Sequence, residues 1–442
     1  MERFLVVISL LIMSFMAVNV YGYSVYDLGV GTDIPVHDTR AIALGGSGVA
    51  SGFSLFDSSL NPANLYFMDG NAFMMSHSLI KSSQNRAIPL WNFFDSYVDE
   101  STYARNEHFY NELSFGINYS LSFGDSKLAA AFIMRPIVNF GADYSEEVRN
   151  AGNSHNSAYP PILAKNFIES AGLLDSYSFL LNYGMALPFD DINISLGVEV
   201  SLLKGDYEFE ERIHWTDTAR TLATEPEQLI DVYSKTTNKM DGVGTKFGIS
   251  SQVTERWRLG MSYSPMVSLA TDLKKTSSTE EIFVYDSPDY VLPSKFRMGF
   301  LFRPRNPFTT NFQFDFETIN YSEINKYYED GYAFYVGMEH YIGRAVPLRL
   351  GFSHRSAKQD KSISLPIVSG GTSFSVIPNV QIDIAGEYGK REYSDLDLFP
   401  DGFYNHRGLW PNNHTPSDRG WESPDSVSES FWKVFTSLTI KF

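Results

Sequence analysis

Hydrophobic and polar residues alternate along several segments of this 442-residue chain. In the clearest segment the apolar side chains are Leu113, Phe115, Ile117, Tyr119, Leu121 and Phe123, and the residues between them are small or polar. An alternation of period two places the two kinds of side chain on opposite faces of a β-strand. After Gly124-Asp125-Ser126 a second alternating run begins at Leu128, so the two runs predict a hairpin with a tight turn.

The same unit recurs along the chain. Further pairs of runs lie at Tyr177–Leu187 and Ile192–Leu202, Val243–Val253 and Trp257–Tyr263, Phe296–Phe302 and Phe308–Phe316, Tyr332–Ile342 and Leu348–Phe352, and more weakly Phe374–Val376 and Val380–Tyr388. One strand at Ala72–Ser78 and one at Ser430–Phe442 bring the expected number to fourteen. An even number of antiparallel strands can close into a barrel without an open edge, and the last strand would then pair with the first.

The segments between the hairpins are long and polar, and the largest cover about 81–111, 142–175, 214–240 and 395–428. Short turns at one end and long loops at the other are typical of transmembrane barrels, whose short turns face the periplasm. A strand of about 11 residues, tilted by ~40°, rises about 28 Å, which is enough to cross the apolar layer. A soluble propeller is the alternative, but the sequence has no blade period.

The N-terminus has the features of a secretory signal. Arg3 precedes the apolar run Phe4–Val18, and Val20-Tyr21-Gly22 offers small residues for cleavage. We therefore expect a cleaved signal over residues 1–22, with an uncleaved anchor helix as the alternative. The chain contains no cysteine, and its net charge of −17 argues against nucleic acid as a partner.

Residues 23–70 do not alternate, and 71–442 form the expected barrel. The first of these segments contains Arg40-Ala-Ile-Ala-Leu-Gly-Gly-Ser-Gly-Val-Ala50 and Asn61-Pro-Ala-Asn-Leu65. Its small residues favour tight packing inside a barrel, and Asn61-Pro62 is a turn or helix-start signal. Gly46-Ser47-Gly48 is only a weak indication of a phosphate loop, because no strand precedes it and no lysine follows.

These two phrases resemble the N-terminal hatch of the FadL/TodX outer-membrane transporters. The strand-turn-strand cadence of Val243–Pro265 and the run Leu292–Gly299 also resemble that family, and a final strand ending at Phe442 is similar to the C-terminal signal of outer-membrane barrels. The resemblance implies a fourteen-stranded barrel in the outer membrane of a Gram-negative bacterium, with residues 23–70 as a hatch in the lumen. It also implies passive uptake of hydrophobic compounds such as long-chain fatty acids or aromatic hydrocarbons.

In such transporters the ligand is captured among outer loops, passes a pocket above the hatch and leaves sideways at a kinked third strand. Carried onto this sequence, the resemblance implies gating roles for the hatch residues Gly45, Gly46, Gly48, Asn61, Pro62 and Ala63, and a lateral opening at Pro136, Asn139, Phe140 and Gly141. Proline lacks a ladder donor and glycine weakens strand pairing, so a local break is also expected on physical grounds. The alternative is that Pro136 ends the strand.

Four cations, Lys295, Arg297, Arg303 and Arg349, alternate with apolar residues and are expected to face the lumen. The structural interpretation is that they pair with Asp315, Glu317, Glu339 and Glu387. The functional interpretation is that one of them holds a ligand carboxylate. The sequence has no Gly-x-Ser-x-Gly motif and no metal-ligand pattern among its nine histidines, so we expect neither enzymatic activity nor a metal or cofactor.

The expected partners are a hydrophobic small molecule or lipid and the outer membrane with its lipopolysaccharide, and the expected state is a monomer. The long loops leave a second function open. Some members of the same superfamily serve as outer-membrane binding or assembly components of protein secretion, and these loops could hold such a partner protein.

Overall fold

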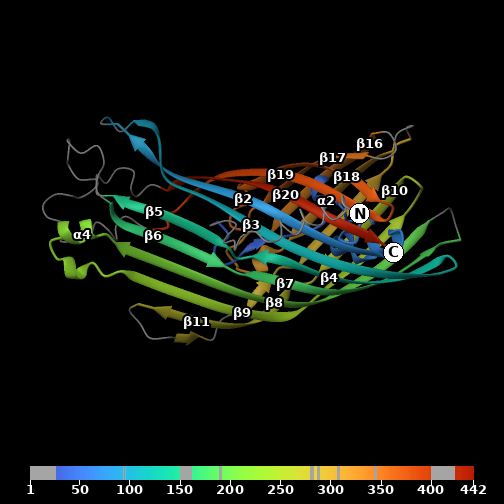
Figure 1. Ribbon diagram of the computed structural model, residues 1–442, viewed down its shortest axis with the longest axis horizontal. Coiled ribbons are helices and arrows are strands. Elements are labelled where there is room, and N and C mark those ends of the chain that lie inside the picture. Colours follow the sequence, from blue (N-terminus) through green and yellow to red (C-terminus); the bar gives the residue numbers. More distant parts are fainter. Residues whose placement is uncertain are drawn as a thin grey trace.

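The computed structural model describes residues 26–92, 94, 96–149, 162–188, 192–278, 283–285, 289–305, 309–342, 346–399 and 424–442. The expected signal and most of the segment 395–428 lie outside these ranges. Figure 1 shows an elongated cylinder of tilted antiparallel strands. No helix in the described ranges is long and apolar enough to cross a bilayer.

The wall is a closed barrel of fourteen antiparallel strands, as the alternation predicted. In chain order its strands are β2 (Ala72–Trp91), β3 (Tyr97–Phe123), β4 (Ser126–Asn139) continued by β5 (Ala142–Arg149), β6 (Ile162–Ala171) continued by β7 (Leu173–Ala186), β8 (Asn193–Trp215), β9 (Val232–Gln252), β10 (Trp257–Ser264) continued by β11 (Val267–Ser277), β12 (Phe283–Tyr285) and β13 (Tyr290–Leu292) continued by β14 (Lys295–Phe302), β15 (Thr310–Ile319), β16 (Gly331–Ile342), β17 (Val346–Ser356), β18 (Ser364–Ile377), β19 (Val380–Asp395) and β20 (Asp425–Lys441).

The barrel closes between its last and first strands. β20 pairs with β2 from Ala72–Lys441 to Ala87–Ser426, and it pairs with β19 on its other edge. The backbone N–H of Phe442 donates to the carbonyl of Asn71 at 3.0 Å. This closure confirms the predicted pairing of the two terminal strands, and it leaves neither of them with a free edge.

The alternation distinguishes the two faces of the wall. On β3, Leu113 and Ile117 are 41% and 46% exposed, whereas the residues that follow each of them, Ser114 and Asn118, are almost completely buried. A polar interior and an apolar exterior are the arrangement of a barrel whose outer surface contacts lipid. The sequence pattern therefore determines which side chains face the lumen.

Several segments that were expected to be loops are strands, which corrects the sequence interpretation. β2 and β3 occupy most of 81–111, β5 and β6 occupy much of 142–175, and β8 and β9 extend to Trp215 and from Val232. In these outer parts polar residues lie on both faces, so the alternation signal is lost although the backbone ladder continues. The outer strands enclose an apolar cluster that includes Tyr144, Ile168 and Trp215.

The N-terminal segment, residues 26–70, contains β1 (Thr32–Asp33), α2 (Thr39–Ala43), α3 (Asp57–Leu60) and the 3-10 helix η1 (Pro62–Phe67). α2 contacts β17 to β20, whereas η1 contacts β4, β7, β8 and β9. Since these are different parts of the wall, the segment lies within the barrel (Figure 1). The remaining helices, α4 (Asp217–Leu222), η2 (Pro226–Gln228) and η3 (Tyr321–Glu323), lie in connections between strands.

A charge on the outward-facing surface tests whether that surface contacts lipid. Val434 is 52% exposed on that surface, and Val434→Arg should lower the free energy of unfolding in lipid vesicles by about 2–4 kcal/mol. Ser428→Arg is the matched control, because Ser428 lies on the same face of β20 but beyond Trp432. The free energy of unfolding of both variants can be measured by denaturant titration. Equal losses in the two variants would contradict the assignment.

Candidate functional site

The glycines of the N-terminal segment lie against the inward face of the wall. Gly45 and Gly46 have φ angles of 71° and 86°, in the left-handed region that favours glycine. A Cβ on Gly351 of β17 would lie 1.8 Å from the backbone nitrogen of Gly45. Two backbones without side chains are therefore needed for this contact, which places the segment directly on the strand.

A single carboxylate anchors the next turn of the segment. The backbone N–H groups of Gly48 and Val49 both donate to one oxygen of Asp315 on β15, at 2.8 and 3.0 Å. Arg297 on β14 pairs with the same oxygen at 2.8 Å, and it also donates to the carbonyl of Gly46. Charge-assisted bonds of this kind are stronger than neutral ones, so Asp315 joins wall and segment at one point.

Asn61, Pro62 and Ala63 form a second contact with the wall. The side chain of Asn61 accepts from the Ala63 N–H at 3.0 Å, which caps η1, and donates to the carbonyls of Val49 at 2.8 Å and Ile249 at 3.1 Å. The carbonyl of Ala63 accepts from Ser195 of β8 at 2.8 Å. The helix-start signal is thus present, and the same asparagine also fixes η1 to β9.

An ion-pair chain holds α2, and the sequence analysis missed the parts of it that Arg40 and Asp383 contribute. Arg40 donates to both oxygens of Glu339 on β16, at 2.9 and 2.6 Å. Arg349 on β17 donates to Glu339 at 2.8 Å and to Asp383 on β19 at 2.7 Å. All four side chains are at least nine-tenths buried. Removing one partner from such a chain leaves an uncompensated buried charge, so the pairs fix the position of α2.

Two buried carboxyl groups of the segment lie together. Asp38 caps α2 through the N–H of Arg40 at 2.8 Å, but its second oxygen and one oxygen of Asp57 have no hydrogen-bond partner among the described residues. Burial and then the neighbouring Asp57 carboxylate raise the pKa of Asp38 to about 8. A proton on Asp38 relieves the repulsion between two adjacent carboxylates, so the pair is held in a protonated form at neutral pH.

The third strand loses its pairing with β3 shortly before Pro136. The β3–β4 ladder ends at Phe115–Met134. On the other edge of β4, the ladder with β7 has a bulge between Pro136 and Val138. β4 nevertheless continues to Asn139, so the alternative that Pro136 ends the strand is wrong. β1 takes the place of β3 as the partner of β4, with Thr32 opposite Asn139.

The end of β4 and its continuation bend into the barrel. Phe140 is only 3% exposed, and its ring centroid lies 5.3 Å from that of Tyr207 and 5.5 Å from that of Tyr290. The Gly141 N–H donates to the side chain of Asn139 at 2.9 Å. A polar cavity of about 320 Å³ adjoins this break and is lined by residues that include Asn111, Asn139, Gly141, Asp175 and Asp206.

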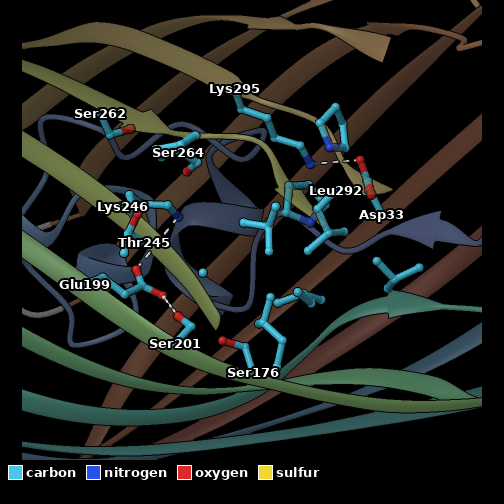
Figure 2. Close-up of a pocket in the computed structure, with 18 of the residues that line it drawn as sticks. Asp33, Ser176, Glu199, Ser201, Thr245, Lys246, Ser262, Ser264, Leu292 and Lys295 are labelled. Atoms are coloured by element: carbon cyan, nitrogen blue, oxygen red, sulfur yellow. Dashed lines mark hydrogen bonds and ion pairs between the residues drawn. The ribbon is translucent and has the colours of Figure 1, made fainter. Parts of the chain in front are cut away.

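A second cavity, of about 150 Å³, lies in the lumen beside the same stretch of β4 (Figure 2). One side of it is apolar and includes Ile34, Ile137, Val138, Leu203, Val267 and Leu292. Hydroxyl and charged groups line the rest, and Figure 2 shows Ser176, Ser201, Ser262 and Ser264 around it. A cavity with one apolar and one polar side suits a small molecule that is largely apolar.

The charges around this cavity are paired. Glu199 on β8 accepts from Arg135 at 3.0 Å and lies 3.9 Å from the ammonium of Lys246, which donates to the carbonyl of Ser59 at 2.5 Å. Lys295 pairs with Asp33 of β1 at 2.9 Å. Burial raises the pKa of Asp33, but the charge of Lys295 offsets this and the pKa is lowered overall. The cavity therefore carries little unbalanced charge.

The four predicted lumenal cations do not converge on one site. Arg297 and Arg349 pair with Asp315 and Glu339, two of the expected carboxylates, whereas Lys295 pairs with the N-terminal segment. Arg303 donates to Asn311 at 3.2 Å. Of the other two expected carboxylates, Glu317 accepts from Tyr335 at 2.6 Å, and Glu387 pairs with Lys433 at 3.2 Å.

The sequence analysis also missed Arg135, Glu199 and Lys246. Glu199 could have been found, since it stands among small residues on the lumenal face of the run Ile192–Leu202, where a charge requires a partner. Within the described residues, no group of three or more acidic or histidine side chains could hold a metal ion.

Solved structures with a similar overall fold are known. The chain is similar to the toluene transporter TbuX of Ralstonia pickettii, with a TM-score of 0.58 and 14% sequence identity over 92% of this chain and 99% of that one. It is also similar to a FadL homologue of Pseudomonas aeruginosa, with a TM-score of 0.57 and 10% identity over 93% and 100% of the two chains. The chain has a FadL/TodX-type fold.

The monoaromatic hydrocarbon channel CymD shares this FadL/TodX-type fold, with a TM-score of 0.54 and 14% identity over 94% of this chain and 99% of that one. Scans of the sequence against protein-family models and curated protein sequences return no match. The likeness therefore lies in the architecture, and these three proteins are described as transporters, channels or a homologue of one.

A methyl group at the glycine contact tests how the N-terminal segment is held. Gly351→Ala should displace Gly45 and destabilise the packing of the segment by about 1–3 kcal/mol, because the backbones cannot separate without losing their contacts. Hydrogen exchange in residues 39–50 should therefore become faster. Gly386→Ala is the control, since its Cβ would meet no atom closer than 3.8 Å. Unchanged exchange in Gly351→Ala would contradict the contact.

The pH dependence of this packing tests the carboxyl pair. The folded pKa of Asp38 is about 8, above the value of about 4 in an unfolded chain. Between these values the folded segment holds a proton that the unfolded segment has lost, so its stability falls as pH rises, by up to about tenfold in the opening equilibrium per pH unit. Corrected hydrogen-exchange protection over residues 38–60 should show this fall.

Asp38→Asn keeps a capping oxygen and donates to Asp57, so it should abolish that dependence. Asp69→Asn, at an exposed carboxyl beyond η1, should leave the dependence intact. A pH profile that is identical in the wild type and Asp38→Asn would show that the pair does not share a proton.

Proposed function

We propose that this protein carries small hydrophobic molecules passively across the outer membrane of a Gram-negative bacterium. The observation that supports this best is the break between β3 and β4, which has a lumenal cavity on one stretch of β4 and a polar cavity adjoining the same residues. A wall that loses its ladder beside an internal cavity offers a route sideways. The similar solved structures include a toluene transporter and a monoaromatic hydrocarbon channel, which supports the same class of cargo.

The route that we propose begins among the outer strands, reaches the lumenal cavity above the N-terminal segment and leaves at Pro136, Asn139, Phe140 and Gly141. In this proposal residues 23–70 act as the hatch. Gly45, Gly46, Gly48 and Asn61-Pro62-Ala63 hold it against the wall, so a ligand has no direct path to the periplasm. Phe140 stands between Asn139 and the polar cavity's Gly141 and packs against Tyr207 and Tyr290, and we propose that its movement opens the exit.

The size of the cavity favours compounds with one aromatic ring over long-chain fatty acids. A volume of about 150 Å³ is the size that accepts benzene in other proteins. The pairing of Arg135 with Glu199 and of Lys295 with Asp33 supports the same choice, because a ligand carboxylate at either cation would have to displace a protein carboxylate. We therefore propose monoaromatic hydrocarbons or compounds of similar size as the cargo.

Cross-linking across the break tests the exit. The chain has no cysteine, so Cys can be introduced at Asn111 and Asn139, which line the same cavity on β3 and β4. A reducible bis-thiosulfonate linker between them should lower uptake of radiolabelled ethylbenzene by Gram-negative cells several-fold, because the strands can no longer separate. Reduction of the linker should restore uptake.

The control pair is Leu121 and Leu128, which already face each other in the intact part of the β3–β4 ladder. A linker there should leave uptake unchanged. If the protein gave cells no more ethylbenzene uptake than an empty vector, the proposed function would be wrong. If uptake were present but indifferent to the Asn111–Asn139 linker, transport would stand and the exit would lie elsewhere.

A further inference from the structure

A third cavity, of about 580 Å³, lies in the outer part of the wall. It is lined by residues 102–105 of β3, 145–148 of β5 and Phe167 of β6, together with Asp397 and Asp425. On β3 the main series of exposed apolar side chains runs from Phe109 to Phe123, and the lining residues 102–105 lie outside this series. The third cavity is separate from the lumenal cavity described above, with which it shares no lining residue.

This cavity opens through the side of the wall. In the described part of the chain no backbone ladder joins β3 to β5, and side chains bridge them instead. Asn106 accepts from the N–H of Ser145 at 3.0 Å, and His108 lies 3.2 Å from Asp143. The lining includes Arg105 and Ser145 from the exposed face and Glu146 from the buried face. We call this opening between β3 and β5 the side window.

The inner wall of the side window is lined by carboxyl groups. Glu146 and Asp425 are 8% and 1% exposed, and Asp397 lies beside them. Burial, with the nearby Asp425 carboxylate, raises the pKa of Asp397 to about 6. The buried cation behind these groups is Arg86, which is already paired with Asp425 at 3.0 Å and Asp395 at 2.7 Å. The charge of Arg86 is therefore already balanced by these two carboxylates, and it does not attract a further anion.

The other cations of the lining belong to its outer rim. The side chain of Arg105 is 69% exposed and pairs with Glu107 at 2.7 Å, and that of Lys165 is 46% exposed and lies 3.8 Å from Glu147. Exposed pairs of this kind are screened by solvent and contribute little. Between rim and interior, Tyr103 and Phe167 provide aromatic surface that can contact both a ring and a cation.

We propose that the side window is the outer binding site for the cargo and that it selects hydrophobic molecules with a cationic or hydrogen-bond-donating head over carboxylates. The inference rests on the proposed function, and it names the class of ligand. A ligand anion entering the window would be buried next to Glu146, Asp397 and Asp425, and the described lining offers no buried free cation to balance it. An ammonium or neutral donor instead meets acceptors, and an aromatic tail lies against Tyr103 and Phe167.

Three ligands with the same ring and different heads test this selection. They are 2-phenylethylamine, ethylbenzene and 3-phenylpropanoate, measured by equilibrium dialysis against the purified full-length protein in lipid nanodiscs at pH 7. The amine should bind about tenfold or more tightly than the carboxylate, because the two differ by two unit charges close to the acidic wall. Equal affinities, tighter binding of the carboxylate, or no binding of the amine would overturn the proposal.

Asp397→Asn should reduce the preference for the amine over the carboxylate, and Asn can keep the bond that Asp397 accepts from the Phe399 N–H at 3.0 Å. Asp272→Asn is the matched control, because its carboxylate is 56% exposed on β11 outside the window, and it should leave the preference intact. Glu147→Gln at the rim is a second variant should Asp397→Asn not fold. If a folded variant of the side window kept the full preference for the amine over the carboxylate, the amine would bind outside the side window.

Different measurements test the proposed transport and the proposed ligand selection, so one can be wrong while the other holds. Ethylbenzene uptake by cells reports transport, and the affinity ratio of amine to carboxylate reports the window. Uptake without any charge preference in binding overturns the selection alone. A clear preference in binding without uptake overturns transport and leaves the binding site in place.

Discussion

The whole architecture depends on the need to satisfy backbone N–H and C=O groups where no water is available. In lipid each unpaired group costs several kcal/mol, so a sheet must close on itself. β20 therefore pairs with both β19 and β2. The same requirement explains how the wall tolerates an interruption. Where β4 leaves β3 after Met134, β1 pairs with the vacated edge of β4 and the Ile34 N–H donates to the carbonyl of Ile137 at 2.9 Å. The N-terminal segment thus completes the ladder at the place where the wall opens.

That segment is held by contacts that depend on shape and on pairing more than on apolar burial. The backbone of Gly45 packs directly on Gly351, and Asp315 accepts from two backbone N–H groups. Glu339 accepts hydrogen bonds from both Arg40 and Arg349. Buried ion pairs of this kind contribute little net stability because both partners lose their hydration. Moving the partners apart is nevertheless costly, because each would be left as an uncompensated buried charge. The lumen is consequently occupied by a segment with one defined position, and the space beside it forms the cavity next to β4.

The three cavities have different chemistry along the length of the barrel. The side window is acidic and aromatic, the lumenal cavity is half apolar with paired charges, and the cavity at the β4 break is polar. Each of them involves the side of β4 and β5 that β3 has left. The loss of the β3–β4 ladder after Met134 accounts for the side window and for the cavity at the break, whereas the lumenal cavity borders the same stretch of β4 from the inside. The proposed route from outer binding site to lateral exit follows from that single interruption.

The sequence by itself determined the fourteen strands, their inward and outward faces and the closure at Phe442, because a period of two is a local property of each strand. It also indicated the break at Pro136, since proline lacks a donor wherever it stands. It could not indicate the outer halves of β2, β3 and β8, where both faces are polar, nor the pairing of Lys295 with Asp33 and of Arg40 with Glu339. Those partners lie 262 and 299 residues apart in the chain, and only the tertiary structure brings them together. The cavities were decided in the same way, because their shape depends on how the N-terminal segment fits a wall built from the rest of the chain.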